Sequence, residues 1–404
     1  MNIKRHIENI IDYGLKQTKV LLVTGPRQSG KTFIMQNHYK KYEYVTFDDN
    51  NELITADKDT QLFFKDRTYP LVIDEAQYSQ NIFRTIKLIV DKSKKKGQII
   101  LTGSQSFDLM EKVNESLVGR ISIIEMSNLS LREMARISFN QCFIPSKKYI
   151  KSREKDLVDY NDLWGKIHRG QFPELTSNKN RNWEWFYRDY INTYLEKDIK
   201  KIINIKNEVS FKKFLICIAA RTGNEIVYDE IASEVGNDAK TIKEWISIVA
   251  QTGLIKIVHT YKNSVLKRMI KNPKLYFMDT GLVCYLVGWK TKEQAKNGAL
   301  AGSLFETFVF SEIAKSYLNA GKTIENIYYY RDKDKKEIDF VIEENGILYP
   351  IEIKMSATID IHWNKYNNYL SKVKNKKVEK ITVICQVDKK YEMENMMVLP
   401  INYI

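Results

Sequence analysis

Cysteine is scarce in this sequence. The 404 residues include only Cys142, Cys217, Cys284 and Cys385, and no two of them form a C-x-x-C pair. Isolated cysteines of this kind are typical of small buried side chains in a reducing compartment. Their spacing excludes a zinc knuckle.

Long apolar segments are missing as well. The run from Phe214 to Ala220 covers seven residues, whereas a helix needs about 20 apolar residues to span a bilayer. The first eight residues are charged and no apolar core follows them, so we expect no signal peptide. There is also no internal repeat and no long disordered tract. The sequence therefore predicts a soluble, cytoplasmic protein that has no membrane partner.

Acidic residues are outnumbered by basic ones. The chain has 64 Lys and Arg against 50 Asp and Glu, a net charge of +14, and its hydrophobic content is 43%. At this length we expect about two or three domains with real hydrophobic cores. The basic excess favours a polyanionic partner, for which DNA is the usual candidate. A genome poor in G and C would also give abundant Lys and Asn, so both explanations stay open.

An apolar run from Lys19 to Val23 leads into a glycine-rich loop with the pattern G-x-x-x-x-G-K-T. The loop consists of Gly25, Pro26, Arg27, Gln28, Ser29, Gly30, Lys31 and Thr32. Glycines allow backbone N–H groups to surround phosphate oxygens, and the start of the following helix adds positive potential. We expect Lys31 to reach the β- and γ-phosphates and the Thr32 hydroxyl to bind Mg²⁺. The pattern thus predicts the phosphate-binding loop of a nucleoside triphosphatase.

Two further apolar runs follow this loop, and each ends in polar residues. The first ends in Asp74 and Glu75, and the second ends in Ser104. Asp74 is expected in the shell of Mg²⁺, and Glu75 is expected to orient or deprotonate the attacking water. Ser104 is placed to sense the γ-phosphate from beside the loop. Three such elements in this order predict ATP and Mg²⁺ as cofactors and hydrolysis as the reaction.

These motifs resemble the AAA+ division of P-loop ATPases, and more narrowly a prokaryotic family with the signatures GPRQ-x-GKT, DE-x-Q and LTGS. Residues 116–120 also resemble the SLxGR element of that family. The resemblance implies a homo-oligomer formed through the AAA+ domains, in which Arg120 is an arginine finger for a neighbouring subunit, worth about 10³–10⁵ in rate. A surface arginine at a helix end fits the same pattern. The C-terminal half resembles the uncharacterised domain that commonly accompanies this ATPase.

From Ser130 to about Lys206 the pattern becomes helical. Aromatic and apolar residues recur there at a spacing of three to four, which predicts a buried helix face between domains. This face consists of Trp183, Phe186, Tyr187, Tyr190, Ile191, Tyr194 and Leu195. An Arg that the family carries nearby is replaced by Lys197, which argues against a bidentate role at that position.

Residues 211–280 fit a winged helix-turn-helix. Helices are expected over 211–220 and 228–235, and a third begins after Asn237 or Asp238 as its cap. Strands at 254–259 and 275–277 would then flank a wing, whose basic residues are Lys262, Lys267, Arg268, Lys271 and Lys274. A DNA reader would insert the third helix into the major groove, with Lys240 and Lys243 near phosphates. Winged helices also serve as scaffolds between domains, so this alternative stays open.

The segment from Lys336 to Lys354 predicts a β-hairpin. Asn345-Gly346 is a strong signal for a two-residue type I′ turn, and that turn places Glu344 opposite Ile347. In this register Asp339 faces Glu352 and Glu337 faces Lys354, and all four lie on one face of the hairpin. Ile338, Phe340, Ile342, Ile351 and Ile353 then point to the other face, into a core. Two carboxylates that face each other at this distance need a cation between them.

An Asp followed by Glu-x-Lys on adjacent strands resembles the PD-(D/E)xK restriction-endonuclease-like nucleases. The resemblance implies that Asp339 and Glu352 bind Mg²⁺, that Lys354 positions or activates the water, and that Glu306 from a preceding helix adds a metal ligand. Glu306 also fits a capping box with Ser303, and Lys354 also fits a cross-strand ion pair with Glu337. A nuclease-like fold that lacks activity is a further alternative.

These patterns predict an α/β protein in four parts. Residues 1–135 form a P-loop AAA+ core with a parallel sheet, 136–206 a helical lid or linker, 207–290 a winged helix, and 291–404 a restriction-endonuclease-like α/β domain. The expected function is an AAA+ ATPase that uses ATP and Mg²⁺ and is coupled to a DNA-binding, metal-dependent endonuclease domain. The alternative is an ATP-dependent switch or assembly protein, whose nuclease-like domain only binds DNA or a protein partner.

Overall fold

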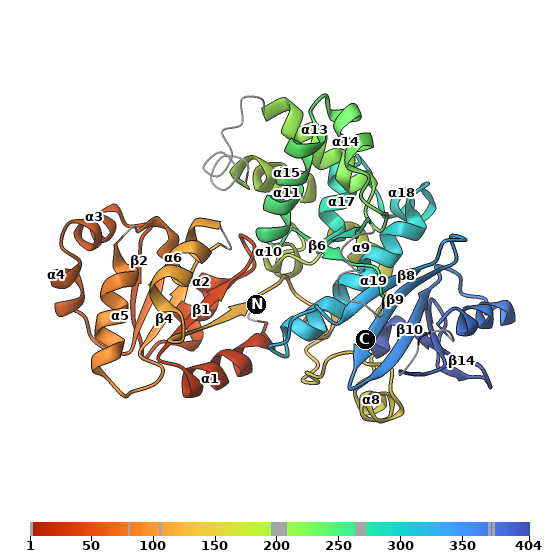
Figure 1. The fold of residues 1–404 in the computed structure, drawn as a ribbon, viewed down its shortest axis with the longest axis horizontal. Helices are drawn as coiled ribbons and strands as arrows, with labels where there is room; N and C mark the ends of the chain where they lie inside the picture. The colour runs from red at the N-terminus through yellow and green to blue at the C-terminus, as the bar shows by residue number, and fades with distance from the viewer. Residues whose placement is uncertain are drawn as a thin grey trace.

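The structure is a computed structural model that describes residues 3–79, 81–104, 107–194, 208–262, 272–370, 373 and 376–404. Figure 1 shows an N-terminal part, red to orange, on one side, a group of green helices above, and a blue C-terminal part on the other side. Among the helices within these ranges, none is long and apolar enough to cross a membrane. The four cysteines are buried thiols.

The N-terminal part is built on a five-stranded parallel sheet with the order β2-β3-β4-β1-β5. Its strands are β1 (Val20–Thr24), β2 (Glu43–Thr46), β3 (Leu71–Asp74), β4 (Ile99–Thr102) and β5 (Ile121–Glu125). The strands β1, β3 and β4 are buried throughout, because helices cover both faces of a parallel sheet. The parallel sheet that the sequence predicts is confirmed, and the three apolar runs named above form β1, β3 and β4.

Alternate residues of β1 pack into two separate cores. Val20 and Leu22 lie in the cluster that includes α5 (Ile82–Lys92) and α6 (Phe107–Leu117). Leu21 and Val23 lie in the cluster that includes α1 (Ile7–Gln17) and α2 (Lys31–His38). The remaining helices of this part are α3 (Asn50–Lys58), α4 (Thr60–Lys65) and the 3-10 turn η1 (Ala76–Tyr78). The sheet is therefore a central layer that holds the carboxyl ends of β1, β3 and β4 at one edge.

A helical region follows β5. It contains α7 (Leu131–Met134), α8 (Lys147–Arg153), η2 (Glu154–Asp156), α9 (Leu163–Arg169), α10 (Pro173–Ser177) and α11 (Trp183–Tyr194). Phe186, Tyr187 and Tyr190 of α11 are buried and contact the ring of Phe172. The aromatic face predicted for this helix is thus a packing surface. Leu195 and Lys197 lie outside the described residues.

Three helices and a β-hairpin come next. The helices are α13 (Glu208–Ala220), α14 (Tyr228–Val235) and α15 (Ala239–Gln251), and the hairpin is β6 (Ile255–Val258) with β7 (Lys274–Phe277). Gly236 ends α14 in the left-handed conformation, and the Asp238 carboxylate caps α15 by accepting from Thr241 N. All of these elements lie where the sequence predicts them. The wing residues Lys267, Arg268 and Lys271 fall outside the described part of the chain.

The C-terminal part is a mixed seven-stranded sheet with the order β13-β14-β12-β10-β9-β8, to which β11 adds beside β10. The strands are β8 (Ile327–Arg331), β9 (Glu337–Glu344), β10 (Ile347–Ile353), β11 (Lys377–Val378), β12 (Ile381–Cys385), β13 (Tyr391–Glu392) and β14 (Met396–Pro400). The helices α17 (Thr280–Leu286), α18 (Lys292–Asn297) and α19 (Ala301–Leu318) precede it, and η4 (Ile361–Asn368) and η5 (Ile401–Tyr403) belong to it.

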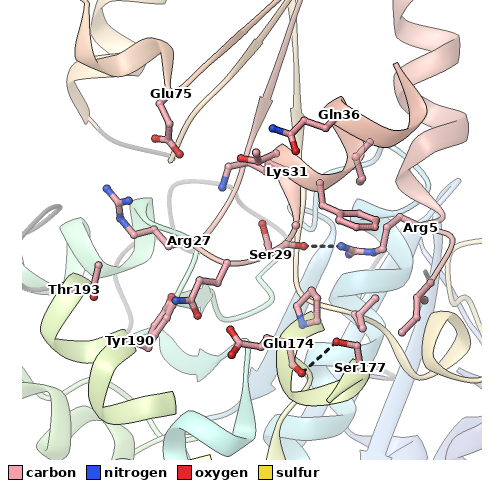
Figure 2. A pocket seen from close by; sticks show the side chains of 18 residues that line it. Arg5, Arg27, Ser29, Lys31, Gln36, Glu75, Glu174, Ser177, Tyr190 and Thr193 are labelled. Carbon is pink, nitrogen blue, oxygen red and sulfur yellow. Dashed lines mark hydrogen bonds between the residues drawn. The ribbon is translucent and has the colours of Figure 1, made fainter. Parts of the chain in front are cut away.

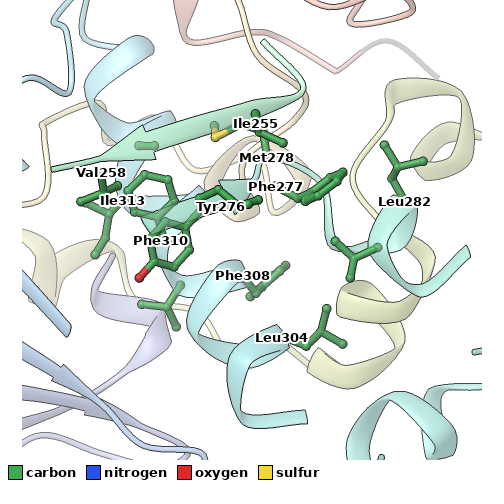
Figure 3. Close-up of a cluster of buried hydrophobic side chains, with 14 of the residues drawn as sticks. Ile255, Val258, Tyr276, Phe277, Met278, Leu282, Leu304, Phe308, Phe310 and Ile313 are labelled. Atoms are coloured by element: carbon green, nitrogen blue, oxygen red, sulfur yellow. The ribbon is translucent and has the colours of Figure 1, made fainter. Parts of the chain in front are cut away.

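Helix α19 is the central element of the C-terminal core. Fifteen of its 18 residues are buried, so the helix is covered on all sides. Figure 3 shows Leu304, Phe308 and Phe310 of α19 packed against residues of β6 and β7, among them Ile255 and Tyr276. The hairpin β6–β7 and the C-terminal sheet therefore share one hydrophobic core.

The register of the β9–β10 hairpin is the predicted one. Ile347 faces Glu344, and the pairs continue regularly to Ile351 opposite Phe340. The two faces of β9 differ from the prediction, however, because Tyr328 of β8 faces Val341 whereas Tyr330 faces Ile338. This bulge gives β9 one extra residue relative to β8.

The bulge changes which residues of β9 pack together. Ile338 packs with Val341 and Leu348, whereas Phe340 packs with Ile342 in another cluster. The prediction that Ile338 and Phe340 share a face is wrong for this reason. The capping box predicted at Ser303 is also wrong, because the N-cap of α19 is Leu300, so Ser303 lies inside the helix.

Candidate functional site

The glycine-rich loop lies between β1 and α2. Gly25 has a φ of 146°, and a Cβ there would lie 2.0 Å from the carbonyl oxygen of Met126, so only glycine fits. Gly30 has a φ of 98° and begins α2 in the left-handed region. The ammonium of Lys31 lies within the loop, where it donates to Gly25 O and Pro26 O at 2.9 Å each. The loop thus has the strand-to-helix position and the backbone geometry of a phosphate cradle.

Asp74 is the centre of a hydroxyl cluster beside this loop. Its Oδ2 accepts from Thr32 Oγ1 at 2.8 Å and from Tyr44 at 2.7 Å, and its Oδ1 accepts from Thr102. The carboxylate is 2% exposed. The structure therefore brings the two residues predicted for Mg²⁺, Thr32 and Asp74, into direct contact. The sequence pointed to Thr102 only as part of the polar end of its strand, which is β4, and it did not point to Tyr44.

Glu75 follows Asp74 in the left-handed conformation, with a φ of 56°. Burial raises the pKa of Glu75, while Gln77 and Lys31 counteract part of that increase. The Gln77 amide donates to Glu75 and also reaches Ser104 Oγ at 3.4 Å. Glu75 and Ser104, predicted from separate strands, are thus joined through one side chain that the family signature DE-x-Q includes.

A cavity of about 650 Å³ opens on the loop, a volume within the usual range for a small-molecule site. Figure 2 shows Lys31, Arg27 and Glu75 on one side of it and Glu174, Ser177, Tyr190 and Thr193 of α10 and α11 on the other. The Ser29 hydroxyl is buried and has no hydrogen-bond partner among the described residues. The cradle, the unpaired hydroxyl and the lysine fit a nucleoside triphosphate with Mg²⁺.

Arg5 ties the loop to the next part of the chain. Its guanidinium, in a residue that is 4% exposed, donates to Ser29 O at 2.8 Å and to Ser127 O at 2.7 Å, and it pairs with the Glu133 carboxylate at 2.9 Å. Burial alone would raise the pKa of Glu133, but Arg5, His6 and two backbone hydrogen bonds lower it to about 2. No sequence motif marks Arg5, which lies upstream of the loop.

A buried polar network continues from this point to α19. Glu133 forms a capping box with Ser130 at the start of α7. The next backbone group, Leu131 N, donates to the Glu312 carboxylate of α19 at 2.7 Å, and Gln171 donates to the same carboxylate at 2.7 Å. Hydrogen bonds, with one covalent backbone step from Ser130 to Leu131, therefore connect the nucleotide loop with the central helix of the C-terminal core.

Arg120 lies at the opposite edge of the sheet from the loop, because it precedes β5 whereas the loop follows the parallel strand β1. Its guanidinium holds Asp91 with two contacts, at 2.6 and 3.0 Å. Arg120 therefore lies away from the nucleotide loop of its own chain, and its role as an arginine finger for a neighbouring subunit stays a prediction. The alternative, that Arg120 is a surface arginine at a helix end, fits its ion pair with Asp91 equally well.

The second candidate site is the acidic end of the β9–β10 hairpin. Glu352 is 3% exposed, its Oε1 pairs with Lys354, and its Oε2 is buried with no partner among the residues described. Asp339 accepts from Ile353 N at 2.7 Å, and burial, together with the carboxylates of Glu352 and Glu306, raises its pKa well above the usual range. An unpaired carboxylate oxygen beside a second carboxylate fits a divalent cation.

Glu306 of α19 lies near this pair but is engaged elsewhere. Its Oε1 accepts from Tyr276 at 2.6 Å and contacts Lys274 Nζ at 3.4 Å. Within the described ranges, no three His, Cys, Asp or Glu side chains are gathered as a metal site. Glu337 pairs with Lys274 and Arg331 and is not an ion-pair partner of Lys354.

Three family models match successive parts of the chain. A model described as an AAA domain matches residues 17–135, and two domains of unknown function, DUF8612 and DUF4143, match 160–293 and 301–404. The uncharacterized proteins Rv2008c of Mycobacterium tuberculosis and Mb2031c of Mycobacterium bovis are each 25% identical over 348 residues, which cover 86% of this chain and 73% of each relative.

The solved structures with some likeness to this chain include a Walker-type ATPase and a branch migration motor. The Walker-type ATPase of Pyrococcus abyssi has a TM-score of 0.41 and 10% identity, covering 70% of this chain and 94% of that one. The RuvB Holliday junction branch migration motor of Thermotoga maritima has a TM-score of 0.29 and 17% identity, covering 62% and 87%. Likenesses of this size say nothing of substrate or partner.

The loop, the Thr32–Asp74 contact and the matched AAA domain define the class of this protein. Its N-terminal part is an AAA-type P-loop ATPase domain. The parts that follow resemble domains to which no function is assigned.

Proposed function

We propose that this chain hydrolyses ATP and uses the nucleotide state to control a DNA-acting C-terminal domain. The observation that carries the ATPase role is the contact of Thr32 with Asp74, beside Lys31 and Glu75, at the mouth of the cavity. Lys31 would bind the terminal phosphates, Thr32 and Asp74 would hold Mg²⁺, and Glu75 would orient the water and accept its proton. The magnesium would neutralise charge on the phosphates.

The nucleotide site is well placed to influence the rest of the chain. The cavity has walls from the ATPase domain and from α10 and α11, so a bound nucleotide would contact both. Arg5 and Glu133 lie between the loop and the network that reaches Glu312 of α19. Opening or closing of the cavity would therefore shift the position of α19. This helix also carries Glu306 near the acidic site.

For the C-terminal domain we propose a metal-dependent endonuclease. The unpaired Oε2 of Glu352 and the raised pKa of Asp339 support a bound Mg²⁺ at these two side chains, with Lys354 beside the reacting water. The acidic pair lies on strands, which hold it rigidly. Glu306 would act on the site from α19.

DNA is the proposed polyanionic partner. On α15, Lys240, Lys243 and Glu244 are exposed whereas Trp245 is 5% exposed, so the outer face of this helix carries two basic residues against one acidic residue and no large aromatic side chain. This arrangement supports the winged-helix role, with α15 toward the DNA. Self-association through the ATPase domains, with Arg120 facing the next subunit, completes the proposal.

One observation favours the alternative of a non-catalytic switch. Glu306 is held by Tyr276 and Lys274, and among the described residues no third carboxylate is placed to hold a metal ion together with Asp339 and Glu352. In that case ATP binding and hydrolysis remain, while the C-terminal domain binds DNA or a protein without cutting.

A cleavage assay on the full chain distinguishes the two. Single-stranded, duplex and branched DNA would be incubated with Mg²⁺ or Mn²⁺, with and without ATP. The endonuclease proposal expects cleavage that Asp339→Asn and Lys354→Met abolish. Lys322→Met is the matched control, since Lys322 is 51% exposed and pairs with Glu344 at a distant edge of the hairpin. Absence of cleavage of every DNA form, in every nucleotide state, would refute the endonuclease proposal and favour the non-catalytic switch.

A further inference from the structure

Lys274 is a buried lysine that the ATPase and nuclease roles leave unused. It is the first residue of β7, and its side chain is 5% exposed. Its Nζ lies 2.5 Å from Glu337 Oε1 and 3.4 Å from Glu306 Oε1, and 5.5 Å from the centre of the Tyr329 ring. A buried ammonium is rare unless it is paired, so the burial of Lys274 needs an explanation.

The lysine and the acidic pair belong to one charge cluster. Four carboxylates form it, those of Glu306, Glu337, Asp339 and Glu352, and electrostatic interactions connect Asp339 with Lys274, Glu306 and Glu352. Two ammonium groups face them, Lys274 and Lys354. Arg331 also contacts Glu337, but its shorter contact, 2.9 Å, is with Glu225 outside the cluster. If all four carboxylates are ionised, as metal binding would require of Asp339 and Glu352, four negative charges against two positive ones leave an excess equal to one divalent cation.

The positions of the ammonium groups show where that excess lies. Lys274 neutralises the Glu306–Glu337 side, and Tyr276 donates a further hydrogen bond to Glu306. On the other side, Lys354 satisfies only one oxygen of Glu352, whose Oε2 has no partner among the described residues. The unsatisfied charge is thus at Asp339 and Glu352.

We propose that Lys274 is a resident cation of the acidic site: it keeps Glu306 and Glu337 out of metal coordination, so that the site takes a single divalent ion at Asp339 and Glu352. This inference rests on the proposed metal site of the C-terminal domain and adds to it. It assigns Lys274 as a positioning residue and limits the site to one ion.

The charge of Lys274 persists under ordinary conditions. Burial alone would lower the pKa of this lysine, but the facing carboxylates Glu306, Glu337 and Asp339 raise it overall. Lysine suits the role because its ammonium is a compact point charge that contacts two carboxylates at once. A strand of the preceding domain thus completes a site whose acids lie in the region 301–404.

The origin of Lys274 has a consequence for experiments. The lysine lies within the matched region 160–293, outside the region 301–404 that carries the four acids. A movement of the β6–β7 hairpin would withdraw the ammonium and leave Glu306 and Glu337 open to a second ion. Metal binding therefore has to be measured on the full chain.

The test is calorimetric titration of Mn²⁺ into chelator-treated full-length protein without nucleotide, in an Asp74→Asn background that removes the carboxylate proposed to hold Mg²⁺ in the ATPase site. We expect one Mn²⁺ for the background protein and two for the Lys274→Met variant. Lys274→Arg keeps the charge and should bind one. The matched control is Lys256→Met, since Lys256 lies on the same hairpin and pairs with Glu125 at 2.5 Å; it should bind one.

Other outcomes separate this inference from the proposed function. If Lys274→Met binds Mn²⁺ with unchanged stoichiometry and affinity, the role of Lys274 is refuted. If the background protein binds none and Lys274→Met binds one, Lys274 still keeps Glu306 and Glu337 from binding metal, but the single ion at Asp339 and Glu352 is refuted, and the metal-dependent nuclease with it. If neither binds, both are refuted.

A second variant covers the case in which Lys274→Met does not fold. Glu306→Gln should keep a stoichiometry of one, because the inference excludes Glu306 as a metal ligand. Loss of Mn²⁺ binding in Glu306→Gln would refute it.

Discussion

The pair formed by Arg5 and Glu133 predicts a large, measurable loss of stability in the ATPase domain. The Glu133 side chain is fully buried and that of Arg5 is 5% exposed, and Arg5 also holds Ser29 O in the phosphate-binding loop. Arg5→Met would leave a buried carboxylate without its main partner. Breaking a buried ion pair from one side typically costs about 3–5 kcal/mol.

The pKa of Glu133 gives an independent magnitude. It is lowered from an ordinary 4.5 to about 2, and each unit corresponds to about 1.4 kcal/mol, so the ionised form gains about 3 kcal/mol from its native surroundings. Because the folded pKa is depressed, this stability is fully present above pH 4.5 and is lost as the pH falls through about 2. At pH 7 the whole amount is therefore available to be lost.

Amide hydrogen exchange in β1 and α2 at pH 7 measures the effect locally. We expect the opening free energy there to fall by about 3 kcal/mol in Arg5→Met. In a cycle with Glu133→Gln the two side chains should show a coupling of about 2–3 kcal/mol. Arg188→Met is the control, since Arg188 is 51% exposed and pairs with Asp189, so its loss should cost less than about 1 kcal/mol. A loss below about 1 kcal/mol in Arg5→Met, or a coupling near zero, would refute the reasoning.

Three further predictions concern the candidate site residues. Glu75→Gln should bind ATP as the wild type does and release phosphate about 10²–10⁴-fold more slowly. The acid limb of the wild-type pH–rate profile should lie above pH 4.5, because burial raises the pKa of Glu75. An unchanged hydrolysis rate in Glu75→Gln would show that Glu75 takes no part in the reaction. With metal chelated, Asp339→Asn should be more stable to heat than the wild type at pH 7, and this difference in stability should shrink as the pH falls toward about 4. The reason is that a carboxyl group whose pKa is raised by folding makes the folded state less stable as the pH rises. Melting temperatures of the two proteins that change in parallel with pH would contradict this. The specific ATPase activity of the wild type should rise with protein concentration, and Arg120→Ala should abolish this rise, which lowers the activity at high concentration by up to about 10³-fold. A wild-type activity that is independent of protein concentration would show that Arg120 is only a surface residue.

Much of the ATPase site could be predicted from the sequence because its parts are local. The loop, the strand before it and the helix after it are contiguous, and the apolar runs that end in Asp74 and Ser104 belong to neighbouring strands of one sheet. Parallel strands bring their carboxyl ends together, so the order of these motifs along the chain was enough to predict that they meet in one site. The hairpin register followed in the same way from Asn345-Gly346.

The contacts that escaped prediction depend on residues far apart in the chain. Arg5 meets Glu133 across 128 residues, and Lys274 meets Glu306 across 32. Neither lies in a motif, and their burial follows only from how the domains pack. The bulge between β8 and β9 was hidden too, because one extra residue in a strand leaves no mark in an apolar pattern. It places Ile338 and Phe340 in different cores.

The central claim is that Lys31, Thr32, Asp74 and Glu75 form a site for Mg²⁺ and ATP. Equilibrium binding of ATP to the full chain, compared with Lys31→Ala, tests it most directly. The account predicts binding by the wild type and an affinity about 10- to 150-fold weaker in the variant, the loss expected for a hydrogen bond to a charged group. No binding to the wild type at millimolar ATP, or equal affinity in both proteins, would contradict it.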